Sequence, residues 1–259
     1  MQVLYTGEGP DGVATYHRGA SGHLTKRGVS ALPDGGSPGA FCVSPNRHCL
    51  FVASSEGAIH TFLIDQGSGD LMPSGDPAPV TDGPAFLTAD RSGRFLLHAS
   101  YGKHSCAVHA IAPSGQVGPE LQHLPTSRNS HCIMTDPTNR FAFVPCIAEA
   151  GGAEGNAIHS FTFDVATGAL ASLGVLTPPP TGPALNRFGS RAELGPRHIT
   201  FHPYQPVMYV ANEQGNSVSA YSMDPCTGAI AHMQTVSTVP ADFSGTSHCS
   251  EIQVHPCYT

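Results

Sequence analysis

The chain has 259 residues and a formal net charge of −7 at pH 7, and it carries no run of basic residues. This charge pattern argues against nucleic acid as a partner. The N-terminus, MQVLYTGEGPDG, has no basic leader followed by an apolar run, and no apolar stretch approaches the ~20 residues that span a bilayer. We therefore expect no membrane segment and a cytoplasmic location.

The composition favours an all-β chain built from many short strands. Glycine (29) and proline (23) are abundant, and only 12% of the residues are charged. The eight cysteines form no C-x-x-C pair, which excludes a zinc ribbon or a thioredoxin motif, and we expect them to be reduced thiols. The fifteen histidines are spread across turns rather than grouped at ligand spacing, so no metal or other cofactor is expected.

Strand-like segments recur in chain order. Two strands open the chain, at Val3–Tyr5 and Val13–Tyr16. Four repeats follow, and each has a short apolar strand, a polar turn, and two further strands. The second strands are expected at Leu50–Ala53, Phe95–Ala99, Phe141–Val144 and Met208–Ala211, and the third strands at Ala58–Phe62, Ala107–Ile111, Ala157–Phe161 and Ser217–Tyr221.

A fourth strand in each repeat is predicted from turns of one type. The segments DVATGAL (164–170) and DPCTGAI (224–230) are near copies, and DQGSGDL (65–71) is a looser one. Aspartate at the start of such a turn bonds its own backbone, and glycine supplies the positive φ that a tight hairpin needs. Each turn therefore predicts a strand directly after it.

The repeat has the period of a β-propeller. The anchor residues Ser44, Asp90, Asp136, His202 and His255 are 46, 46, 66 and 53 residues apart by subtraction. Four-stranded blades recur at about 40–50 residues. The longer step contains a Pro/Gly-rich segment, which we expect to form a loop insertion at 177–194.

The number of repeats predicts an incomplete propeller. At about 45 residues a blade, the chain provides five to six blades. It opens within a blade and ends on SEIQVHPCYT, which we expect to be the first strand of a hairpin without its partner. The prediction is one partial β-propeller domain over 1–259, truncated at its C-terminus.

The segment GPRHITFHPYQPVMYVANEQGNSVSAY carries charged residues at one end of a predicted hairpin. The antiparallel register sets Arg197 opposite Asn212 and leaves Glu213 at the same end. The same construction places His131 at the equivalent end of the 130–146 hairpin. Because the equivalent ends of propeller hairpins converge around the central channel, His131, Arg197 and Glu213 are predicted to share a funnel.

This trio suits the opening or closing of a lactone. Histidine exchanges protons near neutral pH, and partial burial can tune glutamate toward the same range. Arginine offers a permanently charged fork for a carboxylate, a phosphate or a developing oxyanion. No G-x-S-x-G nucleophile motif occurs. Two alternatives stay open, namely a backbone-bonded histidine at position 131 and a structural Arg197–Glu213 ion pair.

Several of these segments resemble the lactonase family of seven-bladed propellers. The matching pieces are GPRHITFHPYQPVMYVANEQGNSVSAY, SHCIMTDPTNRFAFVPC, ADRSGRFLLHASYG and SEIQVHP. The family includes bacterial-type 6-phosphogluconolactonases and fungal carboxymuconate-lactonising enzymes. The resemblance implies that His131, Arg197 and Glu213 occupy positions proposed as catalytic in the lactonising branch.

Three departures from the family accompany the resemblance. Cys146 stands where the phosphogluconolactonase branch often has aspartate, and Asn129 replaces the first histidine of the usual Pro-His-x-His. The family's Ser-Asn-Arg-Gly-His stretch, whose arginine joins the site, would follow Thr259.

We expect a cofactor-independent lactonase that hydrolyses a small anionic sugar-acid lactone, with 6-phosphogluconolactone preferred. His131, Arg197 and Glu213 would be catalytic, and His198 is expected to be structural. Alternatives are a carboxymuconate-lactonising cycloisomerase, a binding propeller without catalysis, or an inactive fragment. The sequence indicates no oligomeric state. Residues expected to contact the substrate are Asn212, Tyr101 and Glu251.

Overall fold

The computed structural model describes residues 2–147, 155–179 and 194–255. Within these ranges the chain forms twenty β-strands and one short 3₁₀ turn at Gly9–Asp11. This confirms the expected all-β class. In the described ranges, no helix has the length and apolar character that crossing a membrane requires.

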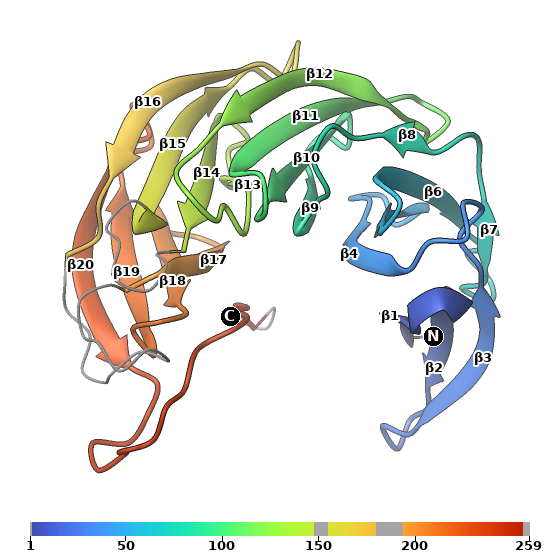
Figure 1. Ribbon diagram of the computed structural model, residues 1–259, viewed down its shortest axis with the longest axis horizontal. Helices are drawn as coiled ribbons and strands as arrows, with labels where there is room; N and C mark the ends of the chain where they lie inside the picture. Colours follow the sequence, from blue (N-terminus) through green and yellow to red (C-terminus); the bar gives the residue numbers. More distant parts are fainter. Residues whose placement is uncertain (1, 148–154, 180–193, 256–259) are drawn as a thin grey trace. The chain divides into compact units, whose positions relative to one another are not determined.

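The strands form five sheets in which, except for β8, neighbours in sequence are hydrogen-bonded neighbours in space (Figure 1). The first sheet holds β1 (Gln2–Gly7), β2 (Val13–Arg18) and β3 (Leu24–Ser30). The second holds β4 (Pro38–Val43), β5 (Cys49–Ser54), β6 (Ala58–Ile64) and β7 (Leu71–Pro73), and β8 (Ala78–Pro79) also pairs with β6. The third holds β9 (Phe86–Ala89), β10 (Phe95–Ser100), β11 (Ser105–Ile111) and β12 (Val117–Pro125).

The last two sheets have the same four-stranded order. The fourth holds β13 (Met134–Thr135), β14 (Phe141–Cys146), β15 (Ala157–Phe163) and β16 (Leu170–Leu176). The fifth holds β17 (Pro196–Phe201), β18 (Val207–Asn212), β19 (Ser217–Met223) and β20 (Ile230–Ser237). Every second and third strand expected from the repeat is present, extended by one or two residues. The four-stranded repeat is thus confirmed, whereas a gap in the ring stays a prediction.

The turns before β7, β16 and β20 have the expected chemistry. Oδ1 of Asp164 accepts the backbone N–H of Ala166 at 2.7 Å, and Asp224 accepts that of Cys226 at the same distance. The glycine four residues after each of these aspartates has a positive φ, 78° at Gly168 and 73° at Gly228. Aspartate and glycine therefore act together to reverse the chain.

The prediction of a strand in SEIQVHPCYT is wrong for the described residues of this segment. Residues 250–255 form no strand, and residues 256–259 lie outside the described ranges. Alternating apolar residues favour a strand only where a neighbouring strand supplies ladder hydrogen bonds. This segment is instead held by contacts of Ser250 and Glu251.

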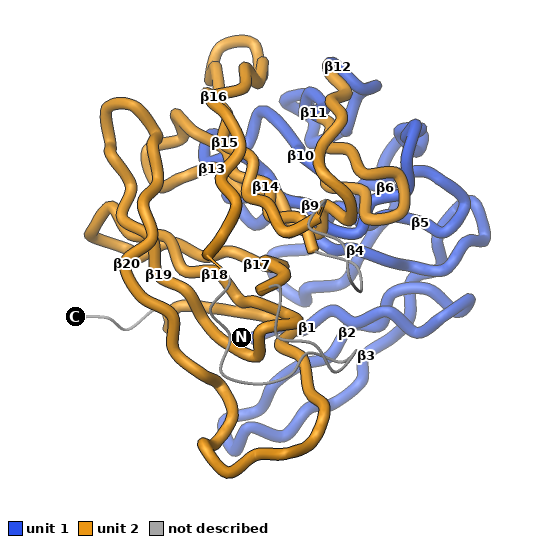
Figure 2. Tube along the Cα trace, turned by 60° about the vertical axis from the view of Figure 1, so that its left-hand side comes forward, with its two compact units in different colours: residues 1–98, 108–121 blue, residues 99–107, 122–259 orange. Residues whose placement is uncertain are grey.

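The chain divides into two compact units, coloured separately in Figure 2. Unit 1 comprises Met1–His98 and Val108–Leu121, and unit 2 comprises Ala99–Ala107 and Gln122–Thr259. The boundary passes through the third sheet. The single-domain organisation stays a prediction, and most of the expected loop insertion, residues 180–193, lies outside the described residues.

Each unit has its own apolar core. In unit 1, one cluster surrounds Phe51 and Leu96 and a second surrounds Val52 and Phe62. In unit 2, the Phe143 ring of β14 lies 6.0 Å from the Phe201 ring of β17, centroid to centroid. This contact packs the fourth sheet against the fifth, so the ends of β14 and β17 are held in a fixed relation.

Candidate active site

A β-bulge at the start of β17 sets the position of Arg197. Phe201 pairs with Met208, but Pro196, not Arg197, pairs with Asn212. The expected Arg197–Asn212 pairing is therefore wrong, because Arg197 is the extra residue of a bulge between Pro196 and His198. A bulge leaves one residue outside the ladder and turns its side chain away from the regular direction.

Arg197 is held by two partners. Its Nε lies 2.8 Å from Oε2 of Glu213, and both side chains are largely buried, with 18% and 11% exposure. Nη1 donates to the backbone oxygen of Ser250 at 2.6 Å. The backbone oxygen of Glu213 accepts the N–H of Cys249 at 3.2 Å. Two contacts thus tie the segment after β20 to the end of the β17–β18 hairpin.

His131 lies at the end of the neighbouring hairpin, as expected from the sequence. Its backbone N–H donates to the oxygen of Pro145 at 3.1 Å, and Ser130 forms an isolated bridge with Cys146. The Tyr101 ring contacts the His131 ring edge-on, with centroids 5.6 Å apart.

These residues share one pocket of unit 2. The pocket has a volume of about 350 Å³, and Tyr101, His131, Arg197, Glu213, His248, Cys249 and Ser250 line it. The structure therefore brings the predicted trio together with Tyr101. Ser250 opens the segment SEIQVHP, but no motif in the sequence pointed to His248 or Cys249. This part of the chain reaches the pocket through the contacts of Ser250 with Arg197 and of Cys249 with Glu213.

A chain of hydrogen bonds runs from Glu251 through His198 to His131. Oε2 of Glu251 lies 2.6 Å from Nδ1 of His198, and Nε2 of His198 lies 3.1 Å from Nδ1 of His131. His198 was expected to be structural, yet it connects two predicted site residues. Consecutive residues of a regular strand face opposite ways, so only the bulge at Arg197 could have indicated that both residues face the site.

The partners fix the tautomers of both rings. An ionised carboxylate only accepts hydrogen bonds, so Nδ1 of His198 carries the proton that Glu251 accepts. Nε2 of His198 is then an acceptor, which agrees with the Arg197 Nη1 donor 3.5 Å away. His131 consequently donates from Nδ1, and its Nε2 carries the lone pair. No described residue forms a hydrogen bond with Nε2 of His131.

Burial keeps both imidazoles neutral. Burial is the largest cause that lowers the pKa of His131 to about 4, and the nearby Arg197 guanidinium and His198 ring lower it further. Burial also lowers the pKa of His198, although Glu251 opposes that shift. His131 is therefore an uncharged proton acceptor at neutral pH.

The other two predicted contact residues lie outside the pocket lining. Asn212 is fully buried, and its Nδ2 donates to the hydroxyls of Ser217 at 3.1 Å and Ser219 at 2.8 Å. Its Nδ2 thus bonds within the fifth sheet, and its contact with a substrate stays a prediction. Glu251 is 50% exposed and reaches the site only through His198.

Two departures from the family have a structural role. Burial raises the pKa of the Cys146 thiol to about 12, so at neutral pH this side chain is a neutral filler beside the site. Asn129 has a positive φ of 58°, and its Nδ2 donates to the oxygen of Ile147 at 3.2 Å. Asparagine tolerates this conformation better than most residues.

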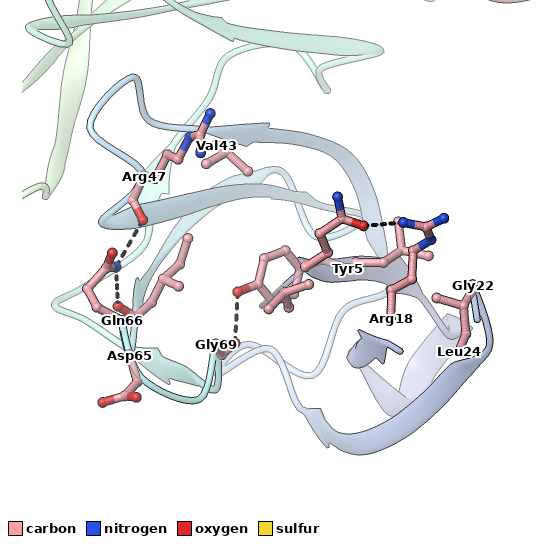
Figure 3. A pocket seen from close by; sticks show the side chains of 13 residues that line it. Tyr5, Arg18, Gly22, Leu24, Val43, Arg47, Asp65, Gln66 and Gly69 are labelled. Carbon is pink, nitrogen blue, oxygen red and sulfur yellow. Dashed lines mark hydrogen bonds between the residues drawn. The ribbon is translucent and has the colours of Figure 1, made fainter. Parts of the chain in front are cut away.

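A larger pocket, of about 900 Å³, belongs to unit 1 (Figure 3). Its described lining includes Arg18 and Arg47 but neither histidine nor glutamate. Arg18 bonds the side chain of Gln2, and the Tyr5 hydroxyl donates to the oxygen of Gly69 at 2.7 Å. Without an imidazole to accept a proton, this pocket is a weaker candidate for acid–base chemistry than the smaller one.

Curated relatives match nearly the whole chain. A 6-phosphogluconolactonase of Pectobacterium carotovorum subsp. carotovorum (strain PC1) is 30% identical over 259 residues, which cover 99% of this chain and 71% of the relative. A 6-phosphogluconolactonase of Yersinia enterocolitica is 29% identical, with 98% and 71% covered. The chain thus spans about 70% of the length of these relatives.

Solved structures share the fold. The periplasmic gluconolactonase of Pseudomonas aeruginosa superposes with a TM-score of 0.71 at 19% identity, covering 96% of this chain and 69% of that one. A protein from Lactobacillus plantarum gives a TM-score of 0.70 at 22% identity, covering 90% of this chain and 65% of that one. A family model described as "Lactonase, 7-bladed beta-propeller" matches residues 4–258. The chain therefore belongs to the lactonase family of seven-bladed β-propellers, which is a family of lactone hydrolases.

Proposed function

We propose that the pocket at His131 hydrolyses a sugar-acid lactone, with 6-phosphogluconolactone as the preferred substrate. One observation carries the proposal: a neutral imidazole with its Nε2 lone pair available shares a pocket with a fixed guanidinium. The names of the relatives support the substrate class. The volume of about 350 Å³ lies in the range that holds small ligands.

His131 acts as the general base. Its Nε2 takes a proton from a water molecule, whose oxygen attacks the lactone carbonyl carbon and forms a tetrahedral intermediate. The intermediate collapses by breaking the bond between that carbon and the ring oxygen. The proton returns from His131 to the ring oxygen, which leaves as a hydroxyl group. The products are the open-chain acid and a regenerated neutral imidazole.

The hydrogen-bonded chain stabilises the charge that forms on His131. When Nε2 gains a proton, the Nδ1 proton can shift toward His198, whose own Nδ1 proton is held by the Glu251 carboxylate. Positive charge then moves onto His198, whose ring is hydrogen-bonded to the Glu251 carboxylate. His198 and Glu251 are positioning residues in this scheme, and His131 is the catalytic residue.

Arg197 stabilises negative charge on the substrate. Its Nε is committed to Glu213 and its Nη1 to Ser250, while no described residue accepts a hydrogen bond from Nη2. The remaining donors suit the developing oxyanion or the phosphate of the substrate. Glu213 holds the guanidinium in place, so its loss would misdirect those donors.

The test measures acid release in a pH-stat. Substrates are 6-phosphogluconolactone, gluconolactone and carboxymuconolactone, each corrected for spontaneous hydrolysis. We expect turnover of the phosphorylated lactone, and a fall in kcat/KM of about 10²–10³ in Arg197→Ala and Glu213→Gln. Arg27→Ala, an exposed arginine of β3 in unit 1, is the matched control and should retain full activity.

Three outcomes would decide against the proposal. Turnover of carboxymuconolactone alone would assign the lactonising chemistry instead. Equal activity of Arg197→Ala and Arg27→Ala would remove the pocket from the reaction. No turnover of any of the three lactones by the folded chain would favour a binding propeller without catalysis.

A further inference from the structure

A second cluster of ligand-type side chains lies on the third sheet, in unit 1 and outside the lactone site. His98 comes from β10, His109 from β11 and Glu120 from β12, three strands that run side by side in Figure 1. One ligand atom from each lies within 4.8 Å of the other two. We propose that these residues bind one divalent transition-metal ion, with the ligand preferences of Zn²⁺, and that the ion cross-links the three strands.

The two histidines already have the spacing of metal ligands. Nε2 of His109 lies 3.2 Å from Nδ1 of His98. In a tetrahedral zinc site with metal–nitrogen distances of about 2.0–2.1 Å, two ligand nitrogens are about 3.3 Å apart. A Zn²⁺ ion could therefore replace the proton shared by these nitrogens without a large movement of either ring.

The neighbouring backbone orients His109 as a ligand. Its Nδ1 lies 3.0 Å from the oxygen of Gly118, a carbonyl that can only accept, so Nδ1 donates. The Nε2 lone pair is thereby directed at the cluster. Metal-binding histidines commonly donate their other nitrogen to a backbone carbonyl in this way, which fixes both the tautomer and the ring orientation.

Glu120 supplies the anionic ligand and is itself held in place. Thr81 donates to its carboxylate twice, from the backbone N–H to Oε1 and from the hydroxyl to Oε2, each at 2.8 Å. Each carboxylate oxygen has a second lone pair, so these bonds leave it able to ligate. No lysine or arginine of the described chain pairs with Glu120, so a cation would neutralise a partly buried charge.

Two histidines and one carboxylate form a known zinc-binding set that leaves a fourth position for water. Both imidazoles are fully buried, Glu120 is partly buried, and Thr81 is exposed. The ion would thus enter past Thr81, or bind as the sheet folds.

The experiment compares the chain purified from zinc-supplemented and chelator-treated cultures. Elemental analysis should give one zinc per chain in the first sample. Added Co²⁺ should give visible bands of a tetrahedral N/O site without the charge-transfer band of a thiolate ligand. Metal at a hundred times its Kd should raise Tm by about 5–10 °C.

Variants decide whether this cluster is responsible. His98→Gln and His109→Gln should lose stoichiometric zinc and the Co²⁺ bands, and Glu120→Gln should weaken Co²⁺ binding at least about tenfold. Glu120→Gln keeps an oxygen acceptor for Thr81 and is the variant that tests the proposal if a buried histidine variant fails to fold. His123→Gln, also on β12, and Cys226→Ser, an exposed thiol, are the controls and should bind normally.

Any of three results overturns the proposal. The wild-type chain binds no Zn²⁺ or Co²⁺ stoichiometrically, Glu120→Gln binds as tightly as wild type, or a thiolate band in the Co²⁺ spectrum assigns binding to the cysteines. Metal content, Co²⁺ spectra and Tm do not depend on lactone turnover, so this test is independent of the function proposed for the His131 pocket.

Discussion

The neutral state of His131 predicts how the stability of the chain depends on pH. In the folded chain the pKa of His131 is about 4, because the ring is buried and lies near Arg197 and His198. In the unfolded chain it returns to about 6.5. Between these values the unfolded state binds more protons, so the free energy of unfolding decreases as the pH falls from 6.5 to 4. The contribution is fully present at pH 7.

The size of the effect follows from the same two values. For a group fully shielded from water, the free energy of unfolding would fall by about 2 kcal/mol between pH 7 and pH 5. The imidazole faces a pocket and is partly exposed, so water screens part of this penalty and we expect about 1 kcal/mol. In His131→Gln this share of the pH dependence should disappear.

Urea unfolding at pH 7 and pH 5 measures the difference. Wild type should lose about 1 kcal/mol more than His131→Gln over this interval. Phe143→Leu, a core substitution without a titrating group, should lower the stability of the chain equally at both pH values and serves as the control. If His131→Gln loses as much stability between pH 7 and pH 5 as wild type, the His131 ring is not held neutral. The assignment of His131 as the general base then fails.

Three further predictions follow from the contacts of unit 2. His198→Gln should lower kcat about tenfold at unchanged KM and alter the pH profile of kcat, since it removes the imidazole that receives the Nδ1 proton of His131. An unchanged pH profile would indicate that His198 has a packing role only. Gly195→Ala should lower the free energy of unfolding by about 1–3 kcal/mol, because Gly195 has a φ of 64° and an added Cβ would lie 3.0 Å from Gln214. Thermal unfolding measures this loss, and an unchanged stability would mean that the backbone at the neighbouring bulge can shift to make room for the methyl group. Phe143→Ala should cost about 3–5 kcal/mol in chemical unfolding, since the ring is fully buried against Phe201; a cost below 1 kcal/mol would contradict the proposed packing of β14 on β17.

The local patterns of the sequence were sufficient for the repeat. Alternating apolar residues and Asp-x-x-Thr-Gly turns depend on neighbours within a few positions, so Asp164 and Asp224 could be placed at turns without knowledge of the fold. The same patterns gave the hairpin ends, and with them His131, Arg197 and Glu213 as residues of one pocket. The sequence by itself therefore determined the four-stranded repeat and the main residues of the candidate site.

Contacts between distant segments decided the rest. The bulge at Arg197 depends on how the whole hairpin closes, and no residue type at position 197 announces it. It brings His198 into the site, whereas Asn212 stays bonded to its neighbours inside the sheet. Glu251 joins the site from a segment that forms no strand. Register and side-chain direction depend on pairing partners far along the chain, and for that reason only the tertiary structure fixes them.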